Sequence, residues 1–248
     1  ITKTSKWAIN RKKILERGSQ PLFKKSFFKN FSYLDEWEAK SLISKDGIKI
    51  PKGIKSSGKE LIENAKKLAH PIVVKLLNRK LIHKTDYGAV QLNIKNEAQL
   101  KESMIRIKNN FKPSFQEYYT DCFLVEEMMP RPICELILGI KRDEHFGLVM
   151  TLGSGGIFAD LLDDYQLLLL PAHRDEIYEK IIRLKVGDIL LGYRGAQGTN
   201  LSKLLNCIEA LISFVTKSNP SIIELEINPL FVFREKFVAV DALLAKKE

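Results

Sequence analysis

Two carboxylates and an amide alternate with apolar residues near the end of the chain. Glu224, Glu226 and Asn228 occupy every second position of a β-rich segment. Successive side chains of a strand point to opposite faces, so these three oxygen-bearing groups should share one face. Mg²⁺ prefers such ligands when substrate phosphates and water complete its shell. A solvent-exposed strand face with a salt bridge would show the same pattern.

An aspartate further along the chain should join this row. If the following segment folds back as a hairpin that pairs Phe233 with Phe237, Asp241 lies opposite Pro229 and beside Asn228. A turn that is one residue shorter shifts this register by one position. We therefore predict that Asp241 reaches the same patch as Asn228.

A lysine lies inside an apolar, β-rich segment and is followed by a polar loop. Lys75 stands within residues 72–77, so it either extends to a strand edge or faces an anion in a cleft. The loop at residues 83–89 contains small and polar residues whose backbone N–H groups could hold phosphate oxygens. An ordinary hairpin loop would have the same composition.

Two further segments carry groups that could contact a nucleotide. Residues 124–128 form a strand that ends in two acids and a methionine. This segment could hydrogen-bond an adenine while the methionine packs on its face, or it could run into solvent. The glycine cluster at residues 153–156 is too short for a Walker A loop, and a turn is its simplest interpretation.

Helical and strand patterns alternate along the chain from residue 34 onwards. Helices are expected at about 34–43, 61–69, 97–108, 175–185 and 201–215. Strands are expected at 72–76, 89–94, 122–128, 134–141, 146–152, 222–227, 230–233 and 237–242. Short loops between mixed elements predict an α+β architecture rather than a regular βαβ winding.

The basic charge of the chain is concentrated at its start. Residues 1–30 contain nine Lys or Arg and one acid, so they carry +8 of the net charge of +10. The rest is close to neutral, which argues against nucleic-acid binding by a folded face. We interpret residues 1–33 as a basic tail or linker, with a docking arm or a transit peptide as alternatives.

The lengths of the apolar runs and the spacing of the cysteines indicate the cellular compartment. The longest apolar stretches, such as residues 167–170, are too short to cross a bilayer, so no membrane span is expected. The three cysteines are widely spaced and match no metal or disulfide framework. They indicate unpaired thiols in a reducing, cytoplasmic compartment.

Seven motifs in this order resemble the ATP-grasp domain of the ADP-forming acyl-CoA synthetases. They occupy residues 71–75, 82–86, 124–128, 152–158, 192–195, 226–230 and 238–241. The succinyl-CoA synthetase β subunit is similar over the last two motifs. The resemblance covers roughly residues 34–244, and it implies an ATP-grasp fold whose two lobes, 34–124 and 125–248, clamp a nucleotide.

The resemblance also implies an activity. The chain would be the part of an acid–thiol ligase that transfers a phosphoryl group between ADP/ATP and a phosphohistidine. The family interconverts acyl-CoA, ADP and phosphate with acid, CoA and ATP, using Mg²⁺. A CoA-binding α-type subunit or domain carrying the main phosphohistidine is the expected partner. Another ATP-grasp carboxylate ligase, or a non-catalytic regulatory lobe, is the alternative.

The resemblance assigns expected roles residue by residue. Phosphoryl transfer is expected at His83. Magnesium is expected at Asn228 and Asp241, with Glu226 beside them. Nucleotide contacts are expected from Lys75, from Glu126, Glu127 and Met128 as an adenine hinge, and from Glu135, Gly155, Gly156 and Arg194. Three positions depart from the family pattern: Ala89 replaces a glycine, Arg131-Pro132 replaces a glycine-rich turn, and Leu168 replaces an arginine.

Overall fold

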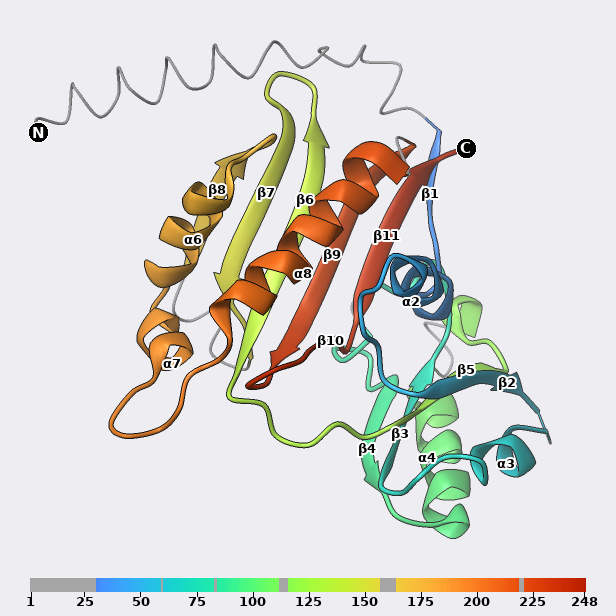
Figure 1. The fold of residues 1–248 in the computed structure, drawn as a ribbon. Helices are drawn as coiled ribbons and strands as arrows, with labels where there is room; N and C mark the ends of the chain where they lie inside the picture. Colours follow the sequence, from blue (N-terminus) through green and yellow to red (C-terminus); the bar gives the residue numbers. More distant parts are fainter. Residues whose placement is uncertain (1–29, 59, 83, 112–115, 157–163, 219–220) are drawn as a thin grey trace, which may run out of the picture.

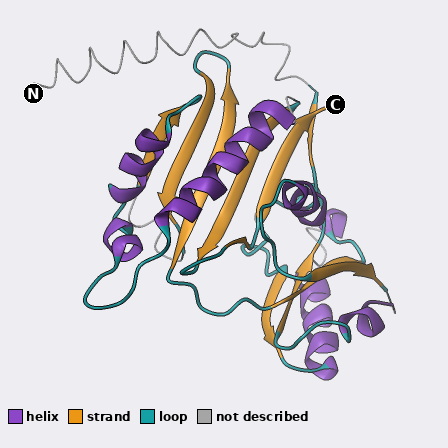
Figure 2. Ribbon diagram, viewed as in Figure 1, coloured by secondary structure: helices purple, strands orange, loops and turns teal. Residues whose placement is uncertain are grey.

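Two β-sheets, each with its own helices, form two lobes (Figures 1 and 2). The computed structural model describes residues 30–58, 60–82, 84–111, 116–156, 164–218 and 221–248. The predicted α+β class is confirmed. Most of the predicted basic tail, and His83, lie outside the described residues.

The larger lobe is built on a seven-stranded sheet with the strand order β1-β11-β9-β6-β7-β8, and β10 pairs with β9. These strands are β1 (Phe31–Tyr33), β6 (Cys134–Asp143), β7 (Gly147–Ser154), β8 (Tyr165–Leu169), β9 (Ile222–Val232), β10 (Phe237–Ala239) and β11 (Ala242–Lys247). Each of these neighbouring pairs is antiparallel.

Helices pack on the larger sheet and bury its main core. They are α2 (Glu36–Lys45), α6 (Arg174–Ile182), α7 (Gly187–Leu191) and α8 (Leu201–Ser213), the last followed by the π-helical turn Phe214–Ser218. Figure 1 shows α8 lying across the sheet. Its predicted apolar stripe is buried at Leu204, Leu205, Ile208 and Leu211. Truncating one of these side chains to alanine would cost about 2–5 kcal/mol of stability.

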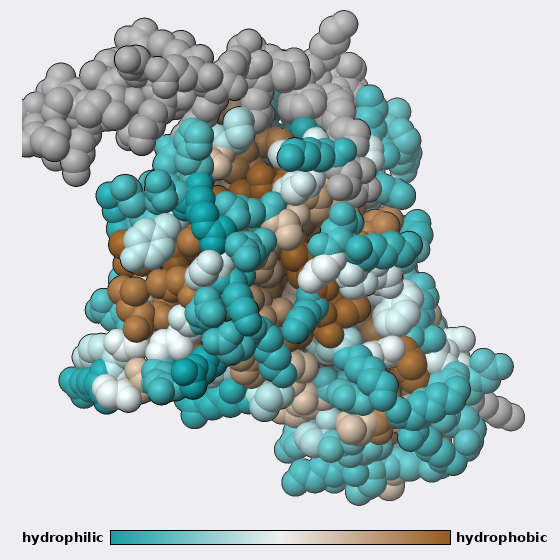
Figure 3. All heavy atoms as spheres, viewed as in Figure 1, coloured by the Kyte–Doolittle hydropathy of each residue, from teal (hydrophilic) through white to brown (hydrophobic). Residues whose placement is uncertain are grey.

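The smaller lobe has a four-stranded sheet with the order β2-β5-β3-β4. Its elements are β2 (Gly53–Ser57), α3 (Glu60–Ala65), β3 (Ile72–Leu76), β4 (Val90–Ile94), α4 (Glu97–Asn110), the 3₁₀ turn Gln116–Tyr118 and β5 (Cys122–Glu127). A second apolar core lies between this sheet and its helices. In Figure 3 hydrophilic residues cover most of this lobe, and apolar surface gathers over the larger one.

The structure contains strands that the sequence patterns did not indicate. β1 lies within the segment predicted as a tail, and β2, β8, β11 and helix α7 were not predicted. β9 is one continuous strand through Pro229, where two strands were expected. β5 spans the predicted lobe boundary at residues 124/125, and β1 and α2 pack with the larger sheet. The division of the chain into two lobes at residues 34–124 and 125–248 stays a prediction.

Two composition-based expectations concern membrane spans and cysteines. Within the described residues, no helix is both long and apolar enough to cross a bilayer. Cys122, Cys134 and Cys207 are free and partly buried.

Candidate active site

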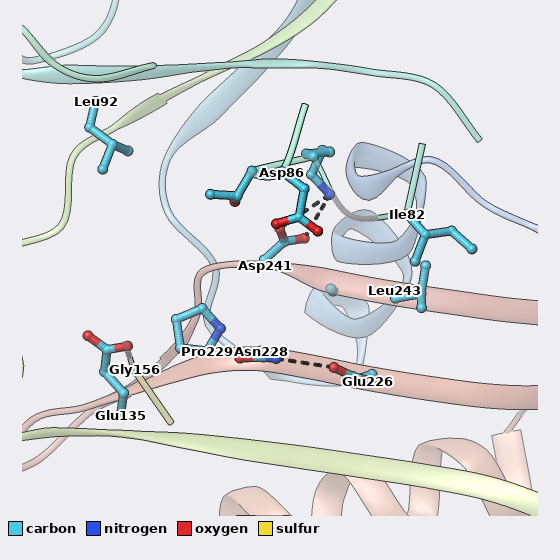
Figure 4. Close-up of a pocket in the computed structure, with 13 residues that line it drawn as sticks. Ile82, Asp86, Leu92, Glu135, Gly156, Glu226, Asn228, Pro229, Asp241 and Leu243 are labelled. Carbon is cyan, nitrogen blue, oxygen red and sulfur yellow. Dashed lines mark hydrogen bonds and ion pairs between the residues drawn. The ribbon is translucent and has the colours of Figure 1, made fainter. Parts of the chain in front are cut away.

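A cavity of about 600 Å³ lies between the two lobes (Figure 4). The smaller lobe lines it with Ile82, Lys84, Thr85, Asp86 and Leu92. The larger lobe lines it with Glu135, Gly156, Glu226, Asn228, Pro229, Asp241, Ala242 and Leu243. The structure therefore brings together the acid row and the polar loop, which lie far apart in the sequence.

The predicted oxygen-rich row is present on β9. Leu225 and Ile227 are buried, whereas Glu226 and Asn228 face the cavity from the other side of the strand. The Asn228 amide nitrogen donates a hydrogen bond to Glu226 Oε1 at 3.3 Å (Figure 4). This contact orients the amide nitrogen toward Glu226 and leaves the amide oxygen for another partner, such as a cation.

Asp241 reaches this row, as predicted, with a register that differs by one position. Phe237 pairs with Val232 rather than with Phe233. The backbone N–H of Asn228 donates to the carbonyl oxygen of Asp241 at 3.3 Å, so the two residues lie opposite each other. The turn is one residue shorter than the one that pairs Phe233 with Phe237. This moves the partner of Asp241 from Pro229 to Asn228.

Lys75 points into the interior, toward carboxylates. Its Nζ atom lies 2.5 Å from Glu36 Oε1 and 3.1 Å from Glu126 Oε2. It also donates to the backbone oxygen of Val240 at 2.9 Å, directly beside Asp241. Burial by itself would lower the pKa of Lys75, but Glu36, Glu126 and Asp241 outweigh this effect and raise the pKa well above its ordinary value.

Glu36 is the buried carboxylate that three lysines share. It stands in the first turn of α2, which Asp35 caps by accepting a hydrogen bond from the Glu38 N–H at 2.9 Å. Besides Lys75, Glu36 pairs with Lys40 at 2.7 Å and with Lys84 at 3.2 Å. Burial would raise the pKa of Glu36, but these three ammonium groups hold it far below its usual range.

The whole buried cluster is close to electrically neutral. Lys40 also binds Glu126 at 2.8 Å, and Lys84 also binds Asp241 at 3.2 Å. Three ammonium groups therefore face three carboxylates. Buried charges are tolerated when they are paired in this way.

The expected adenine hinge is occupied by protein contacts in this structure. The Glu126 carboxylate holds Lys40 and Lys75 rather than facing an open site. The N–H groups of Glu127 and Met128 donate to the carbonyl oxygens of Lys52 and Pro71, each at 2.9 Å. None of the three hinge residues lines the cavity.

The glycine cluster is brought to the cavity beside Glu135. The Gly155 N–H donates to the Glu135 carbonyl oxygen at 2.7 Å, and a side chain at Gly155 would lie 3.0 Å from the Glu135 carbonyl carbon. Gly156 has a φ of +90°, a conformation that favours glycine. Glu135 and Gly156 both line the cavity, and burial raises the pKa of the Glu135 carboxyl.

Two other expected positions lie elsewhere. Arg194 is exposed, and its guanidinium lies 5.2 Å from the centre of the Tyr193 ring, outside the residues that line the cavity. Leu168 pairs with Met150 on β7 and is buried in the apolar core. The arginine expected at position 168 is thus replaced by a core residue.

Comparison with known proteins decides the family. A family model described as an ATP-grasp domain matches residues 29–245. The chain belongs to the ATP-grasp family.

Its relatives place this ATP-grasp domain among the ADP-forming acyl-CoA ligases. It is 31% identical over 213 residues to the beta subunit of ADP-forming acetate–CoA ligase I of Pyrococcus furiosus, covering 84% of this chain and 90% of that subunit. It is 30% identical to ADP-forming 4-hydroxybutyrate–CoA ligase of Nitrosopumilus maritimus, covering 94% of this chain but 33% of that longer protein.

Solved structures of one protein resemble the domain over most of its length. The dinucleotide-forming acetyl-coenzyme A synthetase 1 of Ca. Korarchaeum cryptofilum, in complex with coenzyme A and Ca-AMPCP, matches with a TM-score of 0.78 and 26% identity, covering 95% and 97% of the two chains. Its complex with coenzyme A and Mg-AMPPCP, described with a phosphohistidine segment pointing towards the nucleotide binding site, matches with a TM-score of 0.72 and 25% identity, covering 87% and 93%.

The donor set of the ATP-grasp domain suits a divalent cation that brings its own phosphate ligands. Asp241 supplies a carboxylate and Asn228 an amide oxygen at adjacent positions. Among the described residues, no group of three His, Cys, Asp or Glu could hold a metal by itself. Mg²⁺ uses one or two protein carboxylates and takes its other ligands from phosphates and water, so the residues present fit such an ion.

Several residues of the buried cluster carry no recognisable signal in the sequence. Glu36 and Lys40 have helical i, i+4 spacing, but an exposed helical pair has the same spacing. Lys84 belongs to the polar loop without any local sign of burial. Its partners Glu36 and Asp241 lie in the other lobe, so only the tertiary fold reveals these contacts.

Proposed function

We propose that this ATP-grasp domain binds Mg-ADP or Mg-ATP in the cavity between its lobes. In this proposal it transfers a phosphoryl group between the nucleotide and a phosphohistidine, within an ADP-forming acyl-CoA synthetase. The supporting observation is the meeting of Asp241 and Asn228 from the larger lobe with Lys84 from the smaller lobe at one cavity. Phosphoryl transfer requires charge neutralisation and alignment, and these are the groups that supply both.

The proposed metal-binding residues are Asn228 and Asp241, with Glu226 beside them. A bound Mg²⁺ would neutralise phosphate charge. The cavity is lined by the carboxylates of Asp86, Glu135, Glu226 and Asp241, and Lys84 is the basic residue among the described lining residues. A free polyphosphate would be repelled by this lining, which favours the nucleotide entering as a metal complex.

Lys75 is the proposed phosphate-binding residue of the smaller lobe. Its ammonium contacts the Val240 backbone next to Asp241, so it already faces the proposed metal corner. Contact with phosphate would require it to give up part of its pairing with Glu36 or Glu126. Gly156 lies on the other side of the cavity, beside Glu135. The N–H of Gly155 is already bonded to the Glu135 carbonyl oxygen.

Three parts of the proposal rest on the family alone. His83 is the proposed phosphoryl acceptor, and an imidazole can act as such a nucleophilic carrier. The hinge at Glu126, Glu127 and Met128 is a proposed nucleotide contact that needs a rearrangement of the contacts described above. Arg194 lies outside the cavity lining and is proposed to make no nucleotide contact. The proposed partner is a CoA-binding α-type subunit or domain, since the domain spans most of a beta subunit but a third of a longer ligase.

Calorimetric titration with Mg-ADP tests the binding proposal. We expect binding by the unaltered domain and at least a roughly tenfold loss of affinity in Asp241→Ala, because a metal ligand is removed. Glu144→Ala, in the exposed β6–β7 turn, is the matched control and should bind normally. Equal affinity in Asp241→Ala and Glu144→Ala would contradict the metal assignment.

Labelling with γ-³²P-ATP tests the transfer proposal. We expect acid-labile phosphate on the unaltered domain and none on His83→Ala. An acyl phosphate formed from a carboxylic acid without any phosphoenzyme would instead indicate another ATP-grasp carboxylate ligase. A domain that neither binds nucleotide nor becomes labelled would fit the regulatory alternative.

A further inference from the structure

Lys84 has a different environment from the other two lysines of the buried cluster. The side chains of Lys40 and Lys75 are 0% and 6% exposed, whereas that of Lys84 is 11% exposed and lines the cavity. Lys84 lies 3.2 Å from the Asp241 carboxylate on one side and 3.2 Å from Glu36 on the other. It therefore stands between the closed cluster and the open cavity.

Asp241 is the partner of Lys84 that solvent ions can reach. Its side chain is 30% exposed, and its carboxylate faces the cavity next to Asn228. The Lys84 ammonium donates a hydrogen bond to Asp241 Oδ1 at 3.3 Å. A cation that approached Asp241 from the cavity would meet the Lys84 ammonium already in place.

Lys84 can leave Asp241 without losing its only counter-charge. Glu36 remains 3.2 Å away and is buried, so the ammonium keeps a carboxylate partner. Glu36 in turn is held by Lys40 and Lys75, so it does not depend on Lys84 for its position. The ammonium would therefore keep a buried carboxylate partner after leaving Asp241.

We infer that Lys84 is a resident counter-ion of Asp241, which a divalent cation must displace in order to bind. On entry of the metal–nucleotide complex the ammonium moves from Asp241 to the phosphates while remaining near Glu36. The inference rests on the proposed function, in which Asp241 and Asn228 are the metal ligands. Lys84 is thereby a positioning residue that keeps the Asp241 carboxylate paired until the nucleotide complex arrives.

Binding of Mn²⁺ in the absence of nucleotide, followed by electron paramagnetic resonance, tests the inference. We expect Lys84→Gln to bind Mn²⁺ about tenfold more tightly than the unaltered domain, because a nearby positive charge is removed. Lys84→Arg keeps the charge and should match the unaltered domain. Lys80→Gln removes an exposed lysine from the same β3–β4 connection and should leave Mn²⁺ affinity unchanged.

The same variant should change Mg-ADP affinity in the opposite direction. Lys84→Gln is expected to bind Mg-ADP several-fold more weakly, because the displaced ammonium no longer faces the phosphates. A general loss of structure would weaken both ligands, so opposite shifts distinguish the inference from misfolding. A Mn²⁺ affinity that is unchanged or lower in folded Lys84→Gln would overturn it.

Amine labelling of the unaltered domain provides a second measurement should Lys84→Gln not fold. Adding Mn²⁺ alone should increase the acetylation of Lys84, detected by mass spectrometry, while Lys80 stays constant. Unchanged labelling of Lys84 at saturating Mn²⁺ would overturn the inference. Failure of the proposed function has a different signature: Mn²⁺ competes with Lys84 as expected, but Mg-ADP does not bind the unaltered domain.

Discussion

The Nζ atom of Lys75 lies 2.5 Å from the Oε1 atom of Glu36, in the interior between the two sheets. Glu36 begins helix α2 of the larger lobe, and Lys75 lies on β3 in the smaller lobe. Both side chains are nearly inaccessible to solvent. An ion pair therefore joins the two lobes next to Val240, the residue before the proposed metal ligand Asp241.

Replacing Glu36 with glutamine should destabilise the protein strongly. The substitution leaves three buried lysines facing Glu126 and Asp241 alone, and breaking a buried pair typically costs about 3–5 kcal/mol. Urea denaturation followed by circular dichroism measures this loss. Glu63→Gln, which breaks a solvent-exposed pair with Lys66, should cost much less. Similar losses of unfolding free energy in the two variants would show that the buried cluster contributes no more to stability than an exposed ion pair.

Gly155→Ala should distort the glycine side of the cavity. An added side chain would lie 3.0 Å from the Glu135 carbonyl carbon, so the backbone would have to move. We expect a loss of about 1–3 kcal/mol in thermal denaturation, together with weaker Mg-ADP binding. Gly139→Ala is the control, because its nearest neighbour, Thr151, lies at an ordinary 3.6 Å. Equal behaviour of the two variants would argue against a tight contact at Gly155.

Because of Cys207, the free energy of unfolding should decrease at alkaline pH. Burial raises the pKa of this thiol from its ordinary 9.0 to about 11, so the unfolded chain loses this proton first. The contribution of the buried, protonated thiol to the free energy of unfolding is complete below about pH 9. It is lost as the pH rises through about 11, at a slope of about 1.4 kcal/mol per pH unit. Denaturation measured from pH 7 to 11 should show a shallower decline in Cys207→Ala. A parallel decline would mean that the thiol titrates normally.

Arg194→Ala should leave nucleotide affinity nearly unchanged. The side chain is exposed and stacks over Tyr193, and it does not line the cavity. Calorimetry should show a change in the Mg-ADP dissociation constant of less than about twofold, since no contact is removed. A loss comparable with that of Asp241→Ala would show instead that the loop at residues 192–195 closes over the nucleotide.

The local parts of the site could be predicted because they depend on strand periodicity. Glu226 and Asn228 share a face since their spacing of two matches the strand repeat. Asp241 followed from counting back along a hairpin, and an error of one residue in the turn moved it by one position. Both inferences needed only neighbouring residues.

The remaining parts could not be predicted because their cause is tertiary. The apolar run that contains Leu168 is strand β8. Its exposed residues Leu167 and Leu169 are as apolar as the buried Leu168, so the sequence shows no period-two pattern. β1 pairs with β11 at the other end of the described chain. The burial of Glu36 depends on lysines from both lobes, and its sequence resembles any solvated helix start.

The pairing of β1 with β11 has a consequence for synthesis on the ribosome. The strands and helices of the smaller lobe all lie between α2 and β6 in the sequence, so they can pack as soon as they emerge. β1 must wait, with its hydrogen-bonding edge open, until the ribosome has produced β11. Ribosome profiling combined with pulse proteolysis should therefore find the smaller lobe protected from proteolysis before β1 is protected.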